Sequence, residues 1–448
     1  MINRLLFFWP LLLLLASSVF AAEPAELLSR PVIEGHNTPT NAYPEPRATS
    51  LEYLDVAVLV LALSLASYFA LRRRSRRALF VLAIFSLLWF GFLREGCVCS
   101  IGAIQNVALA LGDPTYGISL AIVAFFVIPL GFTLFFGRTF CSSVCPLGAV
   151  QELVTLHPVK VPTWLDRSLG LIPYIYLGAA VVFAATGTAF IICEYDPFVA
   201  FFRLSGSANM LIFGACFLAI GFYVGRPYCR YLCPYGALLK LASKVSRWRL
   251  RIPPDECINC RLCEDACPYG AIQPPTVEQS DTDRRAARLR TVVLFALAPV
   301  ILGVCIWAGG KLGVPMSHLH PEVLLAERVR LEETGRAEGT TDASDAFYNT
   351  GRPREELYAS ALRLHDQFTK AGYWLGAWVG IVLLVKLIHT SIRRRRTEFT
   401  ADRGNCVSCG RCFWYCPAEQ VRLGLIDGVE QALEIRTGTA ATQTTADK

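Results

Sequence analysis

The feature that most constrains the fold is a series of apolar stretches long enough to cross a lipid bilayer. A helix needs about 20 apolar residues to span the hydrocarbon core, and apolar residues make up 54% of the 448-residue chain. The stretches lie at 53–71, 78–93, 118–136, 171–192, 208–224, 291–308 and 373–388. The sequence therefore predicts an all-α polytopic membrane protein with about seven transmembrane helices. A further apolar stretch, 101–111, is too short to span and predicts an interfacial or re-entrant helix.

The amino-terminal segment has the pattern of a secretory signal peptide. Residues 1–22 place a charged start before an apolar core, followed by small residues around Ala21 and Ala22 that suit cleavage. An uncleaved anchor is the alternative. In either case residues 23–52 are expected to form a short periplasmic segment.

The arginine distribution predicts the orientation in the membrane. Alternate crossings from an outer start place the arginine-rich segments 72–77, 225–290 and 393–396 on the cytoplasmic side, as the positive-inside rule requires. The net charge of +7 is therefore ascribed to orientation. No recognisable DNA-binding motif is present, so direct nucleic-acid contact is not expected. The prediction is a multi-pass protein of the bacterial inner membrane with a cytoplasmic carboxyl terminus.

The predicted domains follow from these boundaries. They are the signal peptide (1–22), the periplasmic segment (23–52), a five-helix membrane domain (53–250), a first ferredoxin half (251–290), a transmembrane helix (291–308), a periplasmic helical cap (309–372), a second transmembrane helix (373–392), and a second ferredoxin half with the tail (393–448).

The two ferredoxin halves are predicted from a repeated cysteine run. The run Cys-x2-Cys-x2-Cys-x3-Cys-Pro comprises Cys257, Cys260, Cys263 and Cys267, and recurs as Cys406, Cys409, Cys412 and Cys416. This spacing is typical of bacterial two-cluster ferredoxins, in which three close thiolates bind one [4Fe–4S] cluster and the fourth reaches the other cluster. Zinc sites more often show separated Cys-x2-Cys pairs. The cofactor prediction is therefore two [4Fe–4S] clusters.

Cross-ligation requires the two runs to meet in space. The membrane hairpin between them returns the chain to the side from which it left, so the halves are expected to reunite. The predicted ligand sets are Cys257, Cys260 and Cys263 with Cys416, and Cys406, Cys409 and Cys412 with Cys267. The alternative, disulfide-bonded loops, is disfavoured because cytoplasmic thiols stay reduced.

A second repeat lies at the predicted membrane edge. Gly-Arg-Thr-Phe-Cys141-x3-Cys145-Pro recurs as Gly-Arg-Pro-Tyr-Cys229-x3-Cys233-Pro, an internal duplication. A spacing of four puts two side chains on one helical face, and a nearby Arg can stabilise a thiolate. The four thiols either hold one further iron–sulfur cluster, bind metal as separate pairs, or are small apolar packing residues.

Three cysteines are expected on the opposite, outer side. Cys97 and Cys99 follow the second predicted helix and Cys193 follows the fourth. A disulfide, an outer redox or metal site, and structural packing remain open for them.

The combination of both cysteine motifs resembles the membrane polyferredoxins of the NosR/NapH family, and NosR-type proteins in particular. The resemblance includes Arg-Glu-Gly-Cys-Val-Cys-Ser-Ile-Gly-Ala (94–103), Cys-Glu-Tyr-Asp-Pro-Phe (193–198), Glu-Gly-Thr-Thr-Asp-Ala-Ser (338–344) and the run at 406–417. It extends over residues 51–423.

The resemblance implies a role in denitrification. NosR-type proteins deliver electrons toward the periplasmic copper enzyme nitrous oxide reductase, and are linked to expression of its gene. The implied partners are that reductase or an intermediary, a donor that is either quinol or a cytoplasmic reductant, and the lipid bilayer. Regulation or maturation of the reductase is the alternative function. The chain is expected to be an electron-transfer component, and no catalytic residue is assigned.

One feature departs from the family pattern. NosR-type proteins carry a periplasmic flavin-binding domain ahead of the first membrane helix, whereas residues 23–52 are too few for one. No FMN is therefore expected on this chain, and a separate flavoprotein is a candidate partner.

Overall fold

The computed structural model describes residues 48–95, 100–203, 208–252, 257, 258, 260–276, 281–391, 396 and 398–429. In this part of the chain the fold is helical except for one pair of two-residue strands. The predicted helical class is thus confirmed. The strands, β1 (Ile272–Gln273) and β2 (Thr400–Ala401), are antiparallel, with Ile272 opposite Ala401.

The membrane domain is built from helices of very different lengths. Its first part comprises α2 (Thr49–Leu71), α3 (Arg76–Ser86), the π-helix η2 (Leu87–Leu93), α4 (Ala103–Gly112), α5 (Leu120–Phe136), α6 (Thr139–Ser143) and α7 (Pro146–Val154). The second part comprises α8 (Thr163–Leu169), α9 (Ile172–Ala185), α10 (Ile191–Tyr195), α11 (Pro197–Arg203), α12 (Ala208–Gly221), α13 (Pro227–Tyr231) and α14 (Pro234–Lys244).

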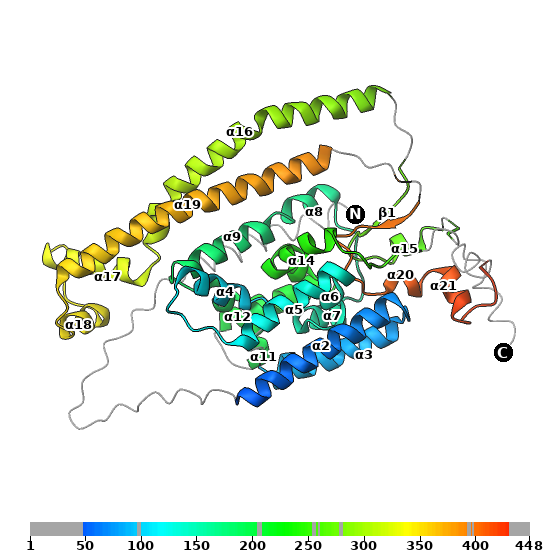
Figure 1. Cartoon of the computed structure of the whole chain (residues 1–448), viewed down its shortest axis with the longest axis horizontal. Coiled ribbons are helices and arrows are strands. Elements are labelled where there is room, and N and C mark those ends of the chain that lie inside the picture. Colours follow the sequence, from blue (N-terminus) through cyan, green and yellow to red (C-terminus); the bar gives the residue numbers. More distant parts are fainter. Residues whose placement is uncertain are drawn as a thin grey trace.

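The rest of the chain forms a helix hairpin and the ferredoxin segments. The long helices α16 (Asp281–Ser317) and α19 (Arg354–Ser391) enclose α17 (Pro321–Glu333) and α18 (Asp342–Asn349). The short helices α15 (Leu262–Asp265), α20 (Arg411–Trp414) and α21 (Pro417–Arg422) lie within the cysteine runs. α17 and α18 lie at one end of the molecule, and α15, α20, α21 and the strands lie at the other (Figure 1). We call these the cap end and the cluster end.

The number of full-length spans differs from the seven predicted. Among the described residues five helices are long and apolar enough to cross a membrane, or six if the bent pair α11 and α12 counts as one span. The stretch predicted at 118–136 forms α5, which has 17 residues and contains Pro129. The stretch predicted at 171–192 ends earlier, because α9 stops at Ala185 and Gly187 adopts φ 70°. In both places the apolar stretch in the sequence is longer than the helix that it forms. The 101–111 stretch is helical, as α4.

The hairpin helices are longer than their predicted apolar parts. The spans were predicted at 291–308 and 373–388, but α16 continues to Ser317 and α19 begins at Arg354. Hydropathy marks where a helix leaves apolar surroundings, not where its hydrogen bonds end. The predicted cap at 309–372 therefore begins and ends inside these helices. Its small core packs Val323, Ala326 and Val329 of α17 against Phe347 and Leu357.

Glycines bring the two hairpin helices into backbone contact. Gly309 and Gly313 of α16 face Gly372 and Gly376 of α19, and a Cβ at Gly309 would collide with the carbonyl oxygen of Gly372. Small residues at a spacing of four allow such close packing between membrane helices. The hairpin is thereby fixed as one unit, which returns the chain to the cluster end (Figure 1).

We expect Gly313→Ala to lower the stability of the purified protein by about 1–3 kcal/mol, the usual cost of overpacking. A Cβ at this position would lie 2.6 Å from the carbonyl oxygen of Phe368. Gly303→Ala, on the same helix, is the matched control because nothing lies within 4 Å of its added Cβ. It should be neutral or stabilise by about 0.5–1 kcal/mol. Thermal unfolding in detergent measures both, and equal shifts would contradict the close helix contact.

Candidate iron–sulfur site

The first thiol set gathers around one cavity at the cluster end. Cys257, Cys260, Cys263 and Cys416 all line one partly open cavity. Three of these cysteines come from the first run and one from the second, which is the combination that cross-ligation predicts. Ile252 and Phe399 complete part of its apolar wall. The cavity thus offers thiols from both halves around a space with an apolar lining.

The second set consists of Cys406, Cys409, Cys412 and Cys267. Cys409 and Cys267 lie close enough to Cys406 for their charges to raise its pKa. The pKa of Cys412 is raised in the same way by the other three thiols of the set. Burial raises the pKa of Cys406 to about 12, with these neighbouring thiolates adding to the rise. Since metal ligation requires deprotonated thiols, binding of iron would release protons here.

The donor set of these thiols suits an iron–sulfur cluster, because such clusters are bound by cysteine thiolates. Within the described ranges, no three His, Cys, Asp or Glu side chains gather closely enough to hold one metal ion. Cysteines bound to a cubane surround a whole core of iron and sulfide, so their sulfur atoms stay further apart. The residues therefore fit the predicted [4Fe–4S] clusters.

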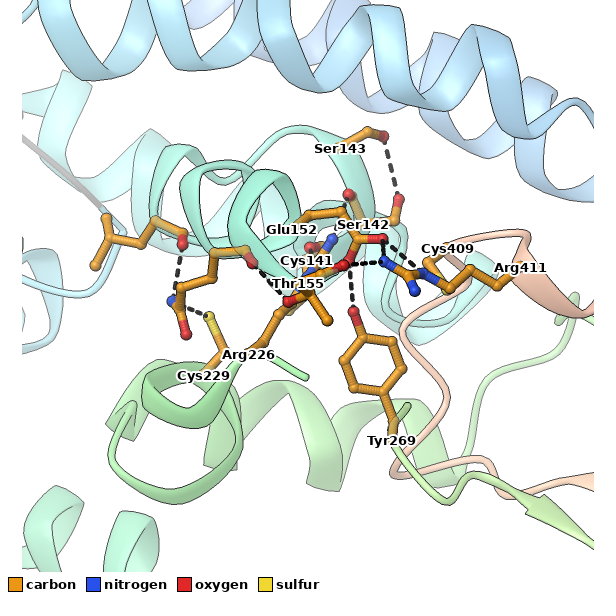
Figure 2. A network of polar contacts seen from close by, with 12 residues as sticks. Cys141, Ser142, Ser143, Glu152, Thr155, Arg226, Cys229, Tyr269, Cys409 and Arg411 are labelled. Carbon is orange, nitrogen blue, oxygen red and sulfur yellow. Dashed lines mark hydrogen bonds and ion pairs between the residues drawn. The ribbon is translucent and has the colours of Figure 1, made fainter. Parts of the chain in front are cut away.

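A buried carboxylate joins the ferredoxin halves to the membrane domain. Glu152 of α7 accepts hydrogen bonds from Tyr269 (2.7 Å) and Arg226 (3.1 Å), and pairs with Arg411 (2.9 Å) and Arg76 (3.2 Å). Figure 2 shows Tyr269, Arg226 and Arg411 converging on this side chain. We call these five residues the Glu152 network.

The network combines five parts of the chain, including α3 with Arg76 and α7 with Glu152. Tyr269 follows the first cysteine run and Arg411 lies inside the second, whereas Arg226 belongs to the second Cys-x3-Cys-Pro repeat. Burial alone would raise the pKa of Glu152, but the charges of Arg226, Arg411 and Arg76 outweigh it and lower the pKa to about 2. The carboxylate is thus charged at neutral pH and fixes both halves against the membrane domain.

The arginine run 72–77 has a second use in the structure. Arg76 donates to the carbonyl oxygen of Cys409 (3.3 Å), and Arg74 pairs with Glu419 (3.4 Å). Arg74 and Arg77 also stack over Phe413 and Trp414. From the sequence, this run was predicted only to orient the chain in the membrane. These contacts hold the second cysteine run against the start of α3.

The Cys-x3-Cys-Pro repeats adopt the same local structure. Cys145 and Cys233 are the N-cap residues of α7 and α14, and Pro146 and Pro234 begin those helices. The proposed single helical face for each cysteine pair is therefore wrong, because the proline starts a new helix after the second cysteine. The backbone amide of Gly236 donates to the sulfur of Cys233 (3.2 Å).

The fold nevertheless brings the two repeats together. Burial raises the pKa of Cys233 well above its ordinary value, and the charges of Cys229, Cys145 and Cys141 raise it further. Arg138 donates to the sulfur of Cys141 (3.5 Å). Four thiols from two chain segments thus share one buried region that contacts the second cysteine run, since Arg138 also donates to the carbonyl oxygen of Gly404 (3.0 Å).

Of the three cysteines predicted on the outer side, the structure describes Cys193. Cys193 is exposed in α10, which follows the end of α9 that points away from the cluster end (Figure 1). Cys97 and Cys99 lie outside the described residues. The three interpretations of these cysteines therefore stay open.

Glu152 was not among the site residues predicted from the sequence. Its only signal was a single acid in the otherwise uncharged helix Pro-Leu-Gly-Ala-Val-Gln-Glu-Leu-Val (146–154). An acid in such a context is seldom buried without partners. Nothing in the sequence identified those partners, because all four lie 74 or more residues away along the chain.

Comparison with known proteins supports iron–sulfur binding. A family model described as a 4Fe-4S binding domain matches residues 118–172 and 207–253, which contain both Cys-x3-Cys-Pro repeats. A second model, also described as a 4Fe-4S binding domain, matches residues 250–273 and so includes the first cysteine run. No solved structure matches the chain.

Curated relatives cover parts of the chain. The uncharacterized protein MJ0750 of Methanocaldococcus jannaschii is 30% identical over 190 residues, which are 40% of this chain and 77% of that protein. The methylamine utilization ferredoxin-type protein MauN of Paracoccus denitrificans is 32% identical over 170 residues, 35% of this chain and 58% of MauN. The regulatory protein NosR of Stutzerimonas stutzeri is 25% identical over 209 residues, 43% of this chain and 29% of NosR.

These similarities agree with the thiol geometry and the apolar helices. The match to NosR is distant and partial, and MauN is named for methylamine utilization instead. The comparisons therefore establish the broad family, but not one particular member of it. The chain belongs to the membrane polyferredoxin family with 4Fe-4S binding domains, and it is an iron–sulfur electron-transfer membrane protein.

Proposed function

We propose that this protein is a NosR-type electron carrier of the bacterial inner membrane, which passes electrons toward periplasmic nitrous oxide reductase. The observation that carries the proposal is the convergence of both cysteine runs on the membrane domain through the Glu152 network. The choice of reductase is supported by the NosR-like strings at 94–103 and 406–417 and by the partial similarity to NosR.

The chain's own residues would bind and insulate two clusters. Cys257, Cys260, Cys263 and Cys416 would hold one, and Cys406, Cys409, Cys412 and Cys267 the other. Bound clusters would supply one-electron transfer. Between the two sets, Cys263, Ile272 and Phe399 form a small buried core. Cys257 of the first set and Cys267 and Cys412 of the second set pack against this core.

The proposed orientation puts the cluster end in the cytoplasm and the cap end in the periplasm. The arginine-rich segment 72–77 at the cluster end supports it, by the positive-inside rule. Electrons would come from quinol or a cytoplasmic reductant. They would leave to the reductase itself, to an intermediary, or to a separate flavoprotein.

The test is nitrous oxide reduction by whole cells of a denitrifier that expresses Cys406→Ser in place of the native protein. We expect the rate to fall to that of the deletion strain, because Cys406 belongs to one of the two predicted ligand sets. Cys305→Ser is the matched control, since Cys305 lies in α16 outside both sets. Full activity of Cys406→Ser with unchanged reductase levels would refute electron delivery.

Regulation of the reductase is the second candidate, favoured by the name of the relative, regulatory protein NosR. The two functions differ in what Cys406→Ser does to the reductase itself. Transcript and copper content of the reductase that stay normal in this variant favour electron delivery. A fall in either that matches the deletion strain would favour regulation or maturation.

A further inference from the structure

Cationic side chains from both ferredoxin halves gather beside the end of α14. This helix ends at Lys244, and the segment that leads from it toward the first cysteine run is described as far as Ile252. Arg403 of the second half lies against the helix end, because its guanidinium donates to the carbonyl oxygen of Lys244 (2.9 Å) and its carbonyl oxygen accepts from the hydroxyl of Ser243 (2.8 Å). We call the cations the basic patch, which consists of Lys244, Arg247, Arg249, Arg251 and Arg403.

The positive charges of the basic patch have no matching acid in the part of the chain that the structure describes. There, none of these cations pairs with a carboxylate, whereas the three arginines of the Glu152 network all do. Burial, and then the charges of Arg403 and Arg251, lower the pKa of Arg249, so like charges crowd together. Asp402, next to Arg403, accepts hydrogen bonds from two backbone amides of its own loop instead. Such a patch attracts an anion.

The basic patch borders the end of a membrane helix. Trp248 stacks on Phe136 (5.6 Å between ring centroids), and its backbone amide donates to the carbonyl oxygen of Phe135 (2.7 Å). These phenylalanines end α5, which packs beside α2, a helix long and apolar enough to cross a membrane. The hydroxyl of Ser67, near the end of α2, lies 3.2 Å from that of Thr139, just beyond α5. The patch therefore lies at the level where α2 and α5 end.

Apolar side chains among the cations are uncovered. Val245 is 70% exposed and Trp248 is 54% exposed, and the guanidinium of Arg247 lies over the indole ring of Trp248 (5.8 Å). Tryptophan is enriched where hydrocarbon meets the headgroups of a bilayer, and clusters of arginine and lysine at that depth attract anionic lipids. An acidic protein would match the charge as well, but the continuity with α5 favours an occupant that already lies in the membrane.

We propose that the basic patch binds the headgroup of an anionic phospholipid, which holds the two ferredoxin halves together at the membrane surface. Arg249 and Arg251 lead into the first cysteine run, and Arg403 precedes the second. A lipid phosphate between them would accept charge-assisted hydrogen bonds from both halves and offset the repulsion between Arg249 and Arg403. The lipid site does not depend on which reductase the protein serves.

The first test adds lipid to full-length protein that has been purified in detergent and stripped of lipid. Phosphatidylglycerol should raise the midpoint of thermal unfolding, because a ligand of the folded state stabilises it, and high salt should reduce the rise. Phosphatidylcholine and inorganic phosphate at the same concentration should have little effect. No rise with phosphatidylglycerol, or an equal rise with either of the other two, would contradict a site for an anionic lipid.

The second test assigns the site to its residues. A basic side chain near the membrane surface contributes about fivefold to the binding of anionic lipid, so Arg249→Gln/Arg251→Gln should bind phosphatidylglycerol about 25-fold more weakly. Arg403→Gln, in the other half, should bind about fivefold more weakly. Arg336→Gln is the control, since Arg336 is an exposed arginine that follows α17 at the cap end. Native mass spectrometry measures the affinities.

Unchanged affinity in the double variant would overturn the proposal and leave the basic patch to an acidic protein partner. Trp248 provides a measurement that does not depend on the arginine variants. Bromine in the acyl chains quenches the fluorescence of tryptophans that contact the lipid, so brominated phosphatidylglycerol should quench the wild type more than Trp248→Phe. Brominated phosphatidylcholine should give a smaller difference between the two proteins. Equal quenching of both by brominated phosphatidylglycerol would place the lipid elsewhere and refute the site.

Discussion

Cys416→Ala is expected to abolish the cluster of the other cysteine run while leaving its own run loaded. Cys416 lies in the second run, but it lines the cavity formed by Cys257, Cys260 and Cys263. Removing a fourth thiolate ligand should cost about four iron atoms per chain, which is one cubane. The EPR spectrum of the reduced protein should lose one cluster signal and keep the other.

The comparison that tests cross-ligation uses four variants. Cys416→Ala and Cys257→Ala should lose the same EPR signal, whereas Cys412→Ala and Cys267→Ala should lose the other one. Within-run ligation makes a different prediction, in which Cys416→Ala pairs with Cys412→Ala. The second pattern would show that the halves bind their clusters separately, and that the hairpin does not bring the ligands together.

The reunion of the ferredoxin halves could be predicted because it follows from chain topology. Two consecutive membrane helices must return the chain to its starting side, and the cysteine spacing identified both halves. The structure shows which contacts join the two halves. β1 pairs with β2, and the backbone amide of Asp402 donates to the carbonyl oxygen of Ala271. No sequence rule predicts strands of two residues, because their pairing depends on contacts already made elsewhere.

Helix ends and buried charges were harder to predict for a common reason. Hydropathy reports the surroundings of a segment, so it located the apolar part of α16 but not its continuation to Ser317. The positive-inside rule ascribed the arginines of 72–77 to membrane orientation, although Arg76 and Arg74 bind carboxylates of distant segments. Ion pairs between residues far apart in the chain leave no periodic signal in the sequence.

Glu152→Gln is expected to destabilise the junction between membrane domain and ferredoxin halves by about 3–5 kcal/mol, the usual cost of removing one partner from a buried ion pair. The amide would leave the guanidinium of Arg226 beside a neutral group. Arg226 is only 1% exposed, so water could not replace the lost carboxylate. Thermal unfolding in detergent and protease cleavage near 396–403 would both report a loosened second half. Glu322→Gln is the control, because its ion pair with Arg352 is 36% exposed on both sides and should be worth about 0–1 kcal/mol.

The pH dependence separates a charge effect from a loss of packing. The pKa of Glu152 is lowered from 4.5 to about 2, so its contribution is complete above the pKa of the unfolded carboxyl and is lost as the pH falls toward 2. The stability difference between wild type and Glu152→Gln should therefore be constant at neutral pH and shrink below about pH 4. A difference that persists unchanged in acid would mean that the side chain acts by shape alone, and that the arginines do not depend on its charge.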